Sequence, residues 1–300
     1  MTLQKKLELY ADVEVDASLK KHTTFRIGGT CKYFVYPKSL FCLMRILDIV
    51  KEANLPLKVF GKGSNLLCSD EDYEGVVVCL DRHLNDFYFE EDGTCLVQAG
   101  ASIILLAHEA MKKSFTGLEF ASGIPGTVGG ALFMNAGAYK SDMSQIVKEV
   151  YVLKDGMIQA MDIVDLDCSY RHTIFQSHPE WIILGCRMKL EFGDQKAIRD
   201  LMDSRRKRRM DSQPLNKPCA GSVFRNPEGY QAWQLVDEIG MRGKRIGGAM
   251  VSEKHSNFIV NEDQAKASDV VALIEEIQKE VKERYQLDMI TEVERFNWKK

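Results

Sequence analysis

The glycine-rich stretch from Glu119 to Tyr139, E-F-A-S-G-I-P-G-T-V-G-G-A-L-F-M-N-A-G-A-Y, constrains the fold more than any other part of the chain. Its five glycines are interleaved with apolar residues, and Glu119 is its only charge. A surface loop would be more polar, and an ordinary helix would carry less glycine. The pattern predicts a buried loop where a ligand meets bare backbone, because exposed N–H groups can bind a pyrophosphate. A tightly packed turn between core elements is the alternative, and composition alone leaves both open.

Composition and charge limit the classes of protein that this chain can belong to. With 300 residues, 28% of them charged and 45% hydrophobic, it is typical of a soluble globular protein of two or three domains. A net charge of −3 gives no general attraction to nucleic acid or anionic membrane. There is no apolar run long enough to span a bilayer and no secretory signal, so a cytoplasmic location is expected. The eight cysteines form no C-x-x-C pair and lie mostly among apolar neighbours, which predicts buried reduced thiols and no metal site.

Hydrophobic patterns divide the chain into three regions. The first has the pattern of a small α/β unit, with strands expected at 31–36, 56–60 and 75–80 and a helix at 39–53. The second has Asp-Gly pairs at 92–93 and 155–156, which predict antiparallel hairpins, besides a strand at 182–191 and helices at 102–114 and 195–211. The third follows two prolines and is expected to hold helices at 229–239 and 264–285 and strands at 256–261 and 289–296. The apolar stripe of the long helix at 264–285 is interpreted as core.

A second glycine-rich segment, Gly61-Lys62-Gly63-Ser64-Asn65, directly follows an expected strand. It lacks the third glycine of a Rossmann fingerprint, whose place is taken by Leu66, and it lacks the Ser or Thr that follows lysine in a Walker A loop. Hydrolase signatures such as G-x-S-x-G and H-E-x-x-H are absent from the sequence. The two segments, 61–65 and 122–137, could together hold a dinucleotide through backbone N–H groups and polar side chains.

Five consecutive basic residues occupy 205–209 at the end of an expected helix. Such a run can bind nucleic acid, but it also suits the negative end of a helix dipole. In an acidic chain without aromatic residues in the run, a phosphorylated small molecule is the better functional interpretation, and no nucleic-acid partner is expected.

Seven motifs, in order along nearly the whole chain, resemble the UDP-N-acetylenolpyruvoylglucosamine reductase family, flavoenzymes of bacterial peptidoglycan precursor synthesis. They are H-T-T-F-R-I-G-G (22–29), G-K-G-S-N-L-L (61–67), S-G-I-P-G-T-V-G-G-A (122–131), N-A-G-A-Y (135–139), S-Y-R-H-T-I-F (169–175), A-G-S-V-F-R-N-P (220–227) and H-S-N-F-I-V-N (255–261).

The resemblance implies an α+β fold with a two-part FAD-binding region of the PCMH/vanillyl-alcohol-oxidase type and a C-terminal α+β substrate domain. The corresponding boundaries are 1–84 and 85–205 for the two FAD-binding subdomains and 206–300 for the substrate-binding domain. It implies bound FAD and NADPH as co-substrate, with reduction of UDP-N-acetyl-3-O-(1-carboxyvinyl)glucosamine, the enolpyruvate ether of UDP-N-acetylglucosamine, to UDP-N-acetylmuramate. NADPH rather than NADH rests on the resemblance alone. A monomer without membrane partners is expected.

The resemblance assigns three catalytic residues, whose types suit the chemistry. Hydride addition to the enol ether leaves negative charge beside the substrate carboxylate, and the planar guanidinium of Arg171 could stabilise it. Ser222 matches the proton donor to the carbanionic carbon. Glu292 matches the carboxyl that helps hold the substrate carboxylate, and would have to be protonated to donate to it. The extra acidic residue of T-E-V-E-R-F makes Glu294 the alternative, and strand alternation does not decide between the two glutamates because it puts both on one face.

The remaining site residues follow from the same motifs. The implied cofactor-binding residues are Gly61, Lys62, Gly63, Ser64, Asn65, Ser122, Gly123, Ile124, Pro125, Gly129, Gly130 and Asn135. The implied substrate-binding residues are Tyr170, Arg225 and Asn226. Two positions depart from the family pattern: Lys62 replaces a small or amide residue, and Ser212 stands where a lysine for the substrate diphosphate is expected. Diphosphate binding could then fall to Arg225, Asn226 or the basic run.

The length is close to that of the shorter form of the family, which lacks an inserted segment whose tyrosine covers the substrate. Two other functions stay open: a flavoenzyme of the same fold acting on a different alcohol or enol, and a sensor that binds a flavin or nucleotide sugar without turnover. The motif around Ser222 argues against the first, and a retained proton donor argues against the second.

Overall fold

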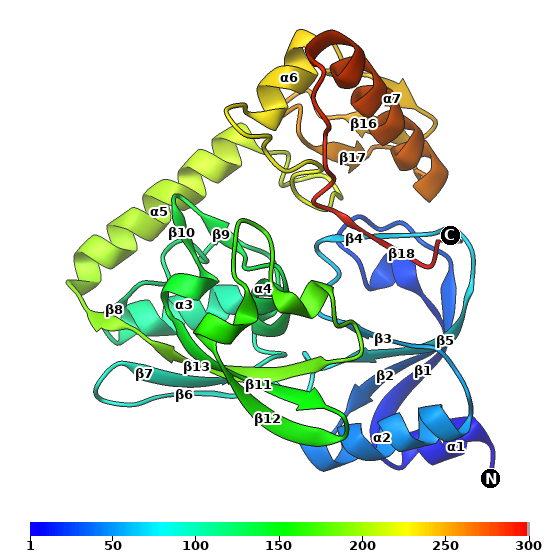
Figure 1. Ribbon diagram of the computed structural model, residues 1–300, viewed down its shortest axis with the longest axis vertical. Coiled ribbons are helices and arrows are strands. Elements are labelled where there is room, and N and C mark those ends of the chain that lie inside the picture. The colour runs from blue at the N-terminus through cyan, green and yellow to red at the C-terminus, as the bar shows by residue number, and fades with distance from the viewer. Residues whose placement is uncertain (299–300) are drawn as a thin grey trace. The chain divides into compact units, whose positions relative to one another are not determined.

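The computed structural model describes residues 1–298, which form two compact units (Figure 1). Each unit is assembled from three separate segments of the chain. The first unit consists of Met1–Val15, Tyr33–Lys62 and Gly75–Lys207. The second unit consists of Asp16–Lys32, Gly63–Glu74 and the chain from Arg208 onward.

The N-terminal part of the chain contributes a four-stranded sheet in the order β1-β2-β5-β3, in which β3 and β5 are parallel. The strands expected at 31–36, 56–60 and 75–80 and the helix at 39–53 are confirmed, and Ser39 caps that helix by accepting from the amide of Cys42. The first helix and strand were not predicted. The bounds are α1 Leu3–Glu8, β1 Ala11–Ser18, β2 Thr30–Pro37, α2 Leu40–Glu52, β3 Leu57–Phe60 and β5 Tyr73–Cys79.

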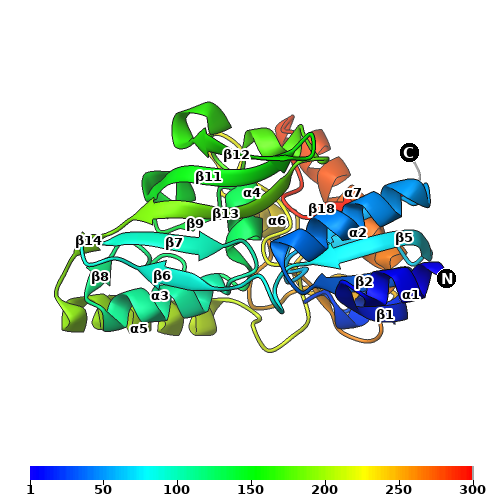
Figure 2. The same ribbon diagram turned by 90° about the horizontal axis from the view of Figure 1, so that it is seen from below.

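A five-stranded antiparallel sheet forms the other part of the first unit (Figure 2), in the order β12-β11-β13-β7-β6. Both Asp-Gly hairpins are confirmed, and Gly93 and Gly156 have the positive φ that such turns need. The bounds are β6 Phe87–Phe89, β7 Thr94–Gln98, α3 Ile103–Lys112, β8 Phe115–Thr116, β11 Val147–Lys154, β12 Met157–Asp162, β13 Ile182–Lys189, β14 Glu191–Phe192 and α5 Gln195–Ser212.

The glycine-rich stretch is only partly a loop, because a short helix, α4 (Val128–Phe133), lies inside it. Thr127 caps this helix, its hydroxyl accepting from the amide of Gly130 at 3.2 Å. The amide of Gly129 donates to the carbonyl of Ala99 at 2.8 Å, so the start of the helix is tied to the chain beyond β7. This tertiary contact outweighs the poor helix propensity of the paired glycines. Two short strands, β9 Gly137–Ala138 and β10 Ser141–Asp142, follow.

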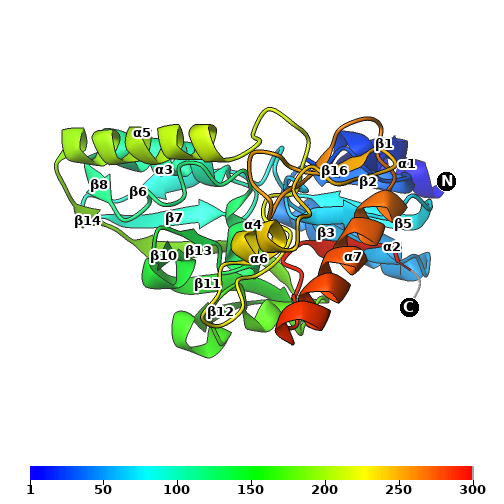
Figure 3. The ribbon, with the colours of Figure 1, turned by 90° about the horizontal axis from the view of Figure 1, so that it is seen from above.

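The second unit holds two helices side by side, α6 and α7 (Figure 3), with the antiparallel sheet β15-β16-β17. The apolar stripe of α7 is core as predicted: Val270, Ile274, Ile277 and Val281 are fully buried. A second, parallel pair joins β4 to β18. The bounds are β4 Leu66–Cys68, α6 Ala232–Glu238, β15 Arg245–Ile246, β16 Ala249–Val251, β17 Ile259–Asn261, α7 Ala267–Tyr285 and β18 Glu294–Phe296.

The cysteines are all free thiols, as predicted. Five are buried, and burial raises the pKa of Cys95 to about 12, so it stays protonated at neutral pH. Among residues 1–298 there is no helix both long and apolar enough to cross a membrane.

The two glycines of α4 give a matched test of the packing. A Cβ at Gly129 would lie 2.9 Å from the Cβ of Ala99, whereas one at Gly130 would meet only the Thr127 hydroxyl at 3.5 Å. We expect Gly129→Ala to lower the free energy of unfolding by about 1–3 kcal/mol. Gly130→Ala should leave it unchanged or raise it by up to about 1 kcal/mol. Urea unfolding of the ligand-free variants measures both, and equal effects would contradict the close approach.

Candidate active site

The two glycine-rich segments meet inside the first unit. A Cβ on Gly61 would lie 2.6 Å from the hydroxyl of Thr127, so only glycine allows the end of β3 to approach the start of α4 this closely. The carbonyl of Gly61 also lies 3.5 Å from the thiol of Cys79 on the neighbouring strand. The predicted association of the first loop with the second is therefore present at Gly61.

Several backbone amides in these segments could receive an anion. Among residues 1–298, the amides of Gly123 and Gly126 donate to no other group, and the same holds for Gly63 and Ser64 in the second unit. Gly63 has a φ of +59°, and a Cβ there would lie 2.2 Å from the carbonyl of His22. Unpaired N–H groups on glycine backbone fit the pyrophosphate of a dinucleotide. The residues present thus fit FAD.

Lys62, which replaces a small or amide residue of the family pattern, forms an ion pair at the surface. Its ammonium lies 3.6 Å from the carboxylate of Asp81, and its side chain is 42% exposed. Asp81 lies two residues after the end of β5. Lys62 is therefore an exposed ion-pair partner, of the kind that contributes little to stability.

Arg171 lies at the tip of a tight turn in the first unit. The amide of Ser169 donates to the carbonyl of His172 at 3.1 Å, and the amide of His172 donates back at 3.2 Å. Arg171 has a φ of +58°, a conformation that glycine or asparagine normally supplies at this position of a turn. Such backbone strain persists only where the surroundings hold it, and it is concentrated at functional sites.

The turn is held by the C-terminal half of the glycine-rich stretch. Asn135 donates to the carbonyl of Ser169 at 3.0 Å, and Thr173 donates to the carbonyl of Phe133 at 2.8 Å. The guanidinium of Arg171 donates to the carbonyl of Gly137 at 2.8 Å. The stretch that was predicted to bind cofactor thus also positions the predicted catalytic arginine.

Three of the predicted cofactor and substrate residues have partners within the protein. Asn135 is buried, and its Oδ1 accepts from the amide of Ser144 at 3.0 Å, so both ends of its amide are engaged within the protein. Ser122 donates to the carbonyl of Glu119 at 2.9 Å. Tyr170 is 52% exposed, and its ring centre lies 5.1 Å from the guanidinium carbon of Arg171.

Ser222 and Glu292 lie on adjacent segments of the second unit. Phe224 and Thr291 form an antiparallel bridge. The amide of Glu292 donates to the carbonyl of Val223 at 2.7 Å. The structure therefore brings the segments of Ser222 and Glu292 together, while Arg171 belongs to the first unit. Glu294 lies farther along, in β18 opposite Leu66.

A buried asparagine that the sequence analysis did not single out holds the segment of Ser222. Asn257 accepts from the amide of Phe224 at 3.0 Å and donates to its carbonyl at 2.9 Å. Its own carbonyl accepts from the amide of Val223 at 2.8 Å. Asn257 is part of the H-S-N-F-I-V-N motif, which was the available signal.

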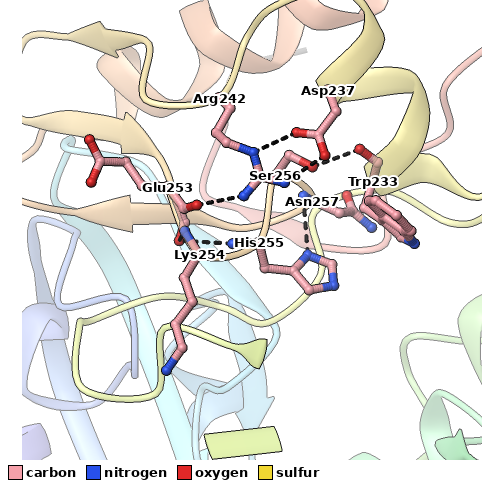
Figure 4. A network of polar contacts seen from close by, with 9 residues as sticks. Trp233, Asp237, Arg242, Glu253, Lys254, His255, Ser256 and Asn257 are labelled. Carbon is pink, nitrogen blue, oxygen red and sulfur yellow. Dashed lines mark hydrogen bonds and ion pairs between the residues drawn. The ribbon is translucent and has the colours of Figure 1, made fainter. Parts of the chain in front are cut away.

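The loop that carries Asn257 is itself anchored (Figure 4). Arg242 donates to both carboxylate oxygens of Asp237 and to the carbonyl of Glu253. Ser256 donates to the carbonyl of Trp233 at 2.6 Å. These contacts tie the loop 252–257 to α6 and the turn that follows it.

The predicted substrate-binding residues differ in whether their polar atoms already have hydrogen-bond partners within the protein. The Nε of Arg225 is buried and has no hydrogen-bond partner within residues 1–298, which suits an anionic ligand. Asn226 instead accepts from the amide of Ala232, at the start of α6, at 2.9 Å. Ser212, which stands where a lysine is expected, is uncharged, and its hydroxyl donates to the carbonyl of Arg208. A cavity of about 450 Å³ lies between residues 210–217 and 250–254.

The basic run of α5 contacts the glycine-rich stretch of the first unit at Arg205. The guanidinium carbon of Arg205 lies 4.7 Å from the ring centre of Tyr139, whose hydroxyl donates to the carbonyl of Arg205 at 3.2 Å. Arg205 therefore has a packing role on this aromatic ring.

Comparison with known proteins agrees with this site. Residues 31–162 match the FAD binding domain family, which defines an FAD-binding protein. Residues 213–296 match the C-terminal domain of UDP-N-acetylenolpyruvoylglucosamine reductase. The chain belongs to the UDP-N-acetylenolpyruvoylglucosamine reductase family, and the α+β fold with an FAD-binding region is confirmed.

Relatives match the chain over nearly its full length. The chain is 42% identical to the UDP-N-acetylenolpyruvoylglucosamine reductase of Anoxybacillus flavithermus, covering 94% of this chain and 93% of that protein. It is 43% identical to that of Bacillus subtilis, covering 92% and 91%. The crystal structure of the Thermus caldophilus enzyme has a TM-score of 0.80 at 32% identity, covering 95% of this chain and 98% of that one.

The hydrogen bonds between Asn257 and Phe224 predict a specific loss of stability when the side chain is changed. Asn257→Asp keeps the side chain's shape but replaces the donor to Phe224 with an oxygen facing the carbonyl. We expect a loss of about 1–3 kcal/mol in the free energy of unfolding. The same substitution at exposed Asn216 should change it by less than about 0.5 kcal/mol. Urea unfolding compares the two variants. An unchanged free energy of unfolding in Asn257→Asp would contradict a stabilising role for these hydrogen bonds.

His255 gives a prediction for the pH dependence of the same loop. Burial, then the nearby charge of Arg242, lower the pKa of its imidazole, whose Nδ1 accepts from the amide of Asn257 at 3.3 Å. The neutral form is thus favoured in the folded state, and its contribution to stability is lost as the pH falls through the lowered pKa. An NMR titration should give a pKa below about 6.5. A value at or above that of a free histidine peptide would contradict this arrangement.

Proposed function

We propose that this protein is an FAD-dependent reductase that uses NADPH to convert UDP-N-acetyl-3-O-(1-carboxyvinyl)glucosamine to UDP-N-acetylmuramate in peptidoglycan precursor synthesis. The observation that carries this proposal is the guanidinium of Arg171, which is held 2.8 Å from the carbonyl of Gly137 on a strained turn. A fixed cation at the end of a dinucleotide-binding stretch is what an enolate-like charge beside a carboxylate requires. Family membership and the names of the relatives support the same reaction.

The other residues have roles that follow from their chemistry. FAD, when bound and reduced by NADPH, would supply the hydride to the substrate. Backbone amides of the glycine-rich stretch in the first unit, such as that of Gly123, would bind its pyrophosphate. Ser222 would deliver a proton to the carbon that becomes carbanionic, and Glu292 on the adjacent segment would help to hold the substrate carboxylate. The Nε of Arg225, which is buried and has no partner within residues 1–298, supports a role in binding the diphosphate.

The proposed division of labour follows three segments of the chain. We propose that 1–84 and 85–205 are the two halves of the FAD-binding region and that 206–300 binds the substrate. The glycine-rich segments within 1–84 and 85–205, and the paired segments of Ser222 and Glu292 within 206–300, support this division. We also propose, from the sequence alone, that the protein is a monomer.

Absorption spectroscopy tests the reaction directly. Purified protein should show the visible bands of oxidised flavin, which NADPH should bleach under anaerobic conditions. Addition of the UDP-enolpyruvyl sugar should then restore them. Failure of NADPH to bleach the bands would exclude the reductase, and bleaching without recovery would favour a flavoenzyme with another substrate. A colourless protein that binds the nucleotide sugar would favour the sensor.

Arg171→Lys separates the two half-reactions. Lysine keeps the charge but lacks the planar fork that meets a carboxylate with two donors. We expect the reoxidation step by the enolpyruvyl substrate to slow by about 10²–10³-fold, the range for loss of one preorganised donor. Reduction by NADPH should change little, since Arg171 is assigned to the substrate carboxylate. Anaerobic rapid mixing measures each step, and equal slowing of both would remove Arg171 from this role.

A further inference from the structure

We infer that Asn65 is a positioning residue for Glu292, in addition to any contact with cofactor. This inference rests on the proposed function, in which Glu292 acts on the substrate carboxylate. Asn65 ends the first glycine loop and directly precedes β4, and the segment carrying Glu292 runs into β18 beside it. The hydrogen bonds of Asn65 therefore connect a cofactor loop to a residue that handles substrate.

Asn65 holds the chain around Glu292 with both its side chain and its backbone. Its Nδ2 donates to the carbonyl of Glu292 at 3.0 Å, and its own carbonyl accepts from the amide of Glu294 at 2.9 Å. These two bonds begin the parallel pairing of β4 with β18, in which Glu294 lies opposite Leu66. The sequence motifs predict only a cofactor role for Asn65. Its contact with Glu292 could not be predicted from them, because the two residues are 227 positions apart.

The peptide groups on both sides of Glu292 are fixed. Its amide donates to the carbonyl of Val223 at 2.7 Å, and its carbonyl accepts from Asn65 at 3.0 Å. Because each peptide group is planar, fixing both leaves little freedom at the Cα and sets the direction of the Cβ. The first of these bonds comes from the segment of Ser222, and the second from the glycine loop. Loss of the second frees the carbonyl side of Glu292.

The rest of the strand has its own supports, so removing the Asn65 side chain should act locally. The amide of Ser69 donates to the carbonyl of Phe296 at 2.9 Å, and the indole of Trp298 donates to the carbonyl of Leu67 at 3.2 Å. Tyr73 packs edge-on against the ring of Phe296 at 4.8 Å between ring centres. With β18 held by these contacts, the expected consequence is a misplaced Glu292 carboxyl in a folded protein.

A carboxamide also has capacity for a cofactor contact, which makes the two roles of Asn65 separable. It has two N–H donors and a carbonyl acceptor, and one donor is committed to Glu292. A cofactor role predicts weaker FAD retention or slower reduction by NADPH when the side chain is removed. The positioning role predicts a defect confined to the step that follows, when the enolpyruvyl substrate is reduced.

The test compares Asn65→Ala with Asn297→Ala in the FAD-loaded protein. Asn297 likewise donates from its side chain to a backbone carbonyl, that of Glu71 at 3.0 Å, and lies directly after β18. Its φ of +60° makes the alanine variant at least as disruptive to the fold. It is therefore a matched control for general structural damage, without a bond to Glu292.

We expect Asn65→Ala to retain FAD through gel filtration and to be reduced by NADPH within about twofold of the wild-type rate. Its reoxidation by the enolpyruvyl substrate should slow by about 10–100-fold, the range for a small misplacement of a catalytic group. Asn297→Ala should leave this ratio of the two rates unchanged. In a Glu292→Gln background, Asn65→Ala should slow reoxidation little further, because both changes remove one function.

Three results would overturn the inference: slowing of reduction by NADPH as large as the slowing of reoxidation, equal slowing in the control, or full additivity with Glu292→Gln. If Asn65→Ala does not fold, Asn65→Asp preserves the volume while removing the donor to Glu292, and the same ratio decides. The proposed function fails differently. In that case the wild-type protein itself shows no bleaching by NADPH or no recovery with the enolpyruvyl sugar, and the inference fails with it.

Discussion

Close backbone approach along the glycine-rich stretch is the constraint on which the first unit depends. The amide of Gly129 lies 2.8 Å from the carbonyl of Ala99, and Gly61 is so near Thr127 that a Cβ would collide with its hydroxyl. At Gly61 and Gly129 a side chain would push the segments apart, which explains glycine there in structural terms. Among residues 1–298, the amides of Gly123 and Gly126 in the same stretch donate to no other group, so the stretch also offers N–H groups to an anion.

The stretch also connects cofactor binding with catalysis. Its helix α4 ends near Phe133, and the following residues hold the turn of Arg171 through the side chain of Asn135 and the carbonyl of Gly137. In the second unit, a corresponding series of hydrogen bonds connects Asn257 to the segment of Ser222, that segment to Glu292, and Glu292 to Asn65. Each predicted catalytic residue thus lies on backbone that is bonded on more than one side.

Much of the fold follows from local sequence, whereas the positioning contacts do not. The Asp-Gly pairs set both hairpins through their turn geometry, and the apolar stripe of α7 follows from helical spacing. The helix inside the glycine-rich stretch could not be predicted, because a contact with Ala99 stabilises it against its own propensity. Asn65 and Asn257 were visible as motif residues, but their partners are backbone groups of distant segments, which no side-chain pattern encodes.

The three residues that position the site, Asn65, Asn135 and Asn257, are all amides, and this choice has an electrostatic consequence. A side-chain amide can both donate and accept. It can therefore pair with a backbone group as a neighbouring strand would, without carrying charge. A lysine or aspartate used in the same way would add a full charge, and two unit charges 4 Å apart near a protein surface interact by about 4 kcal/mol. That energy would act on the negative charge that develops on the substrate. Neutral supports leave stabilisation of that charge to the guanidinium of Arg171, whose turn is held by Asn135.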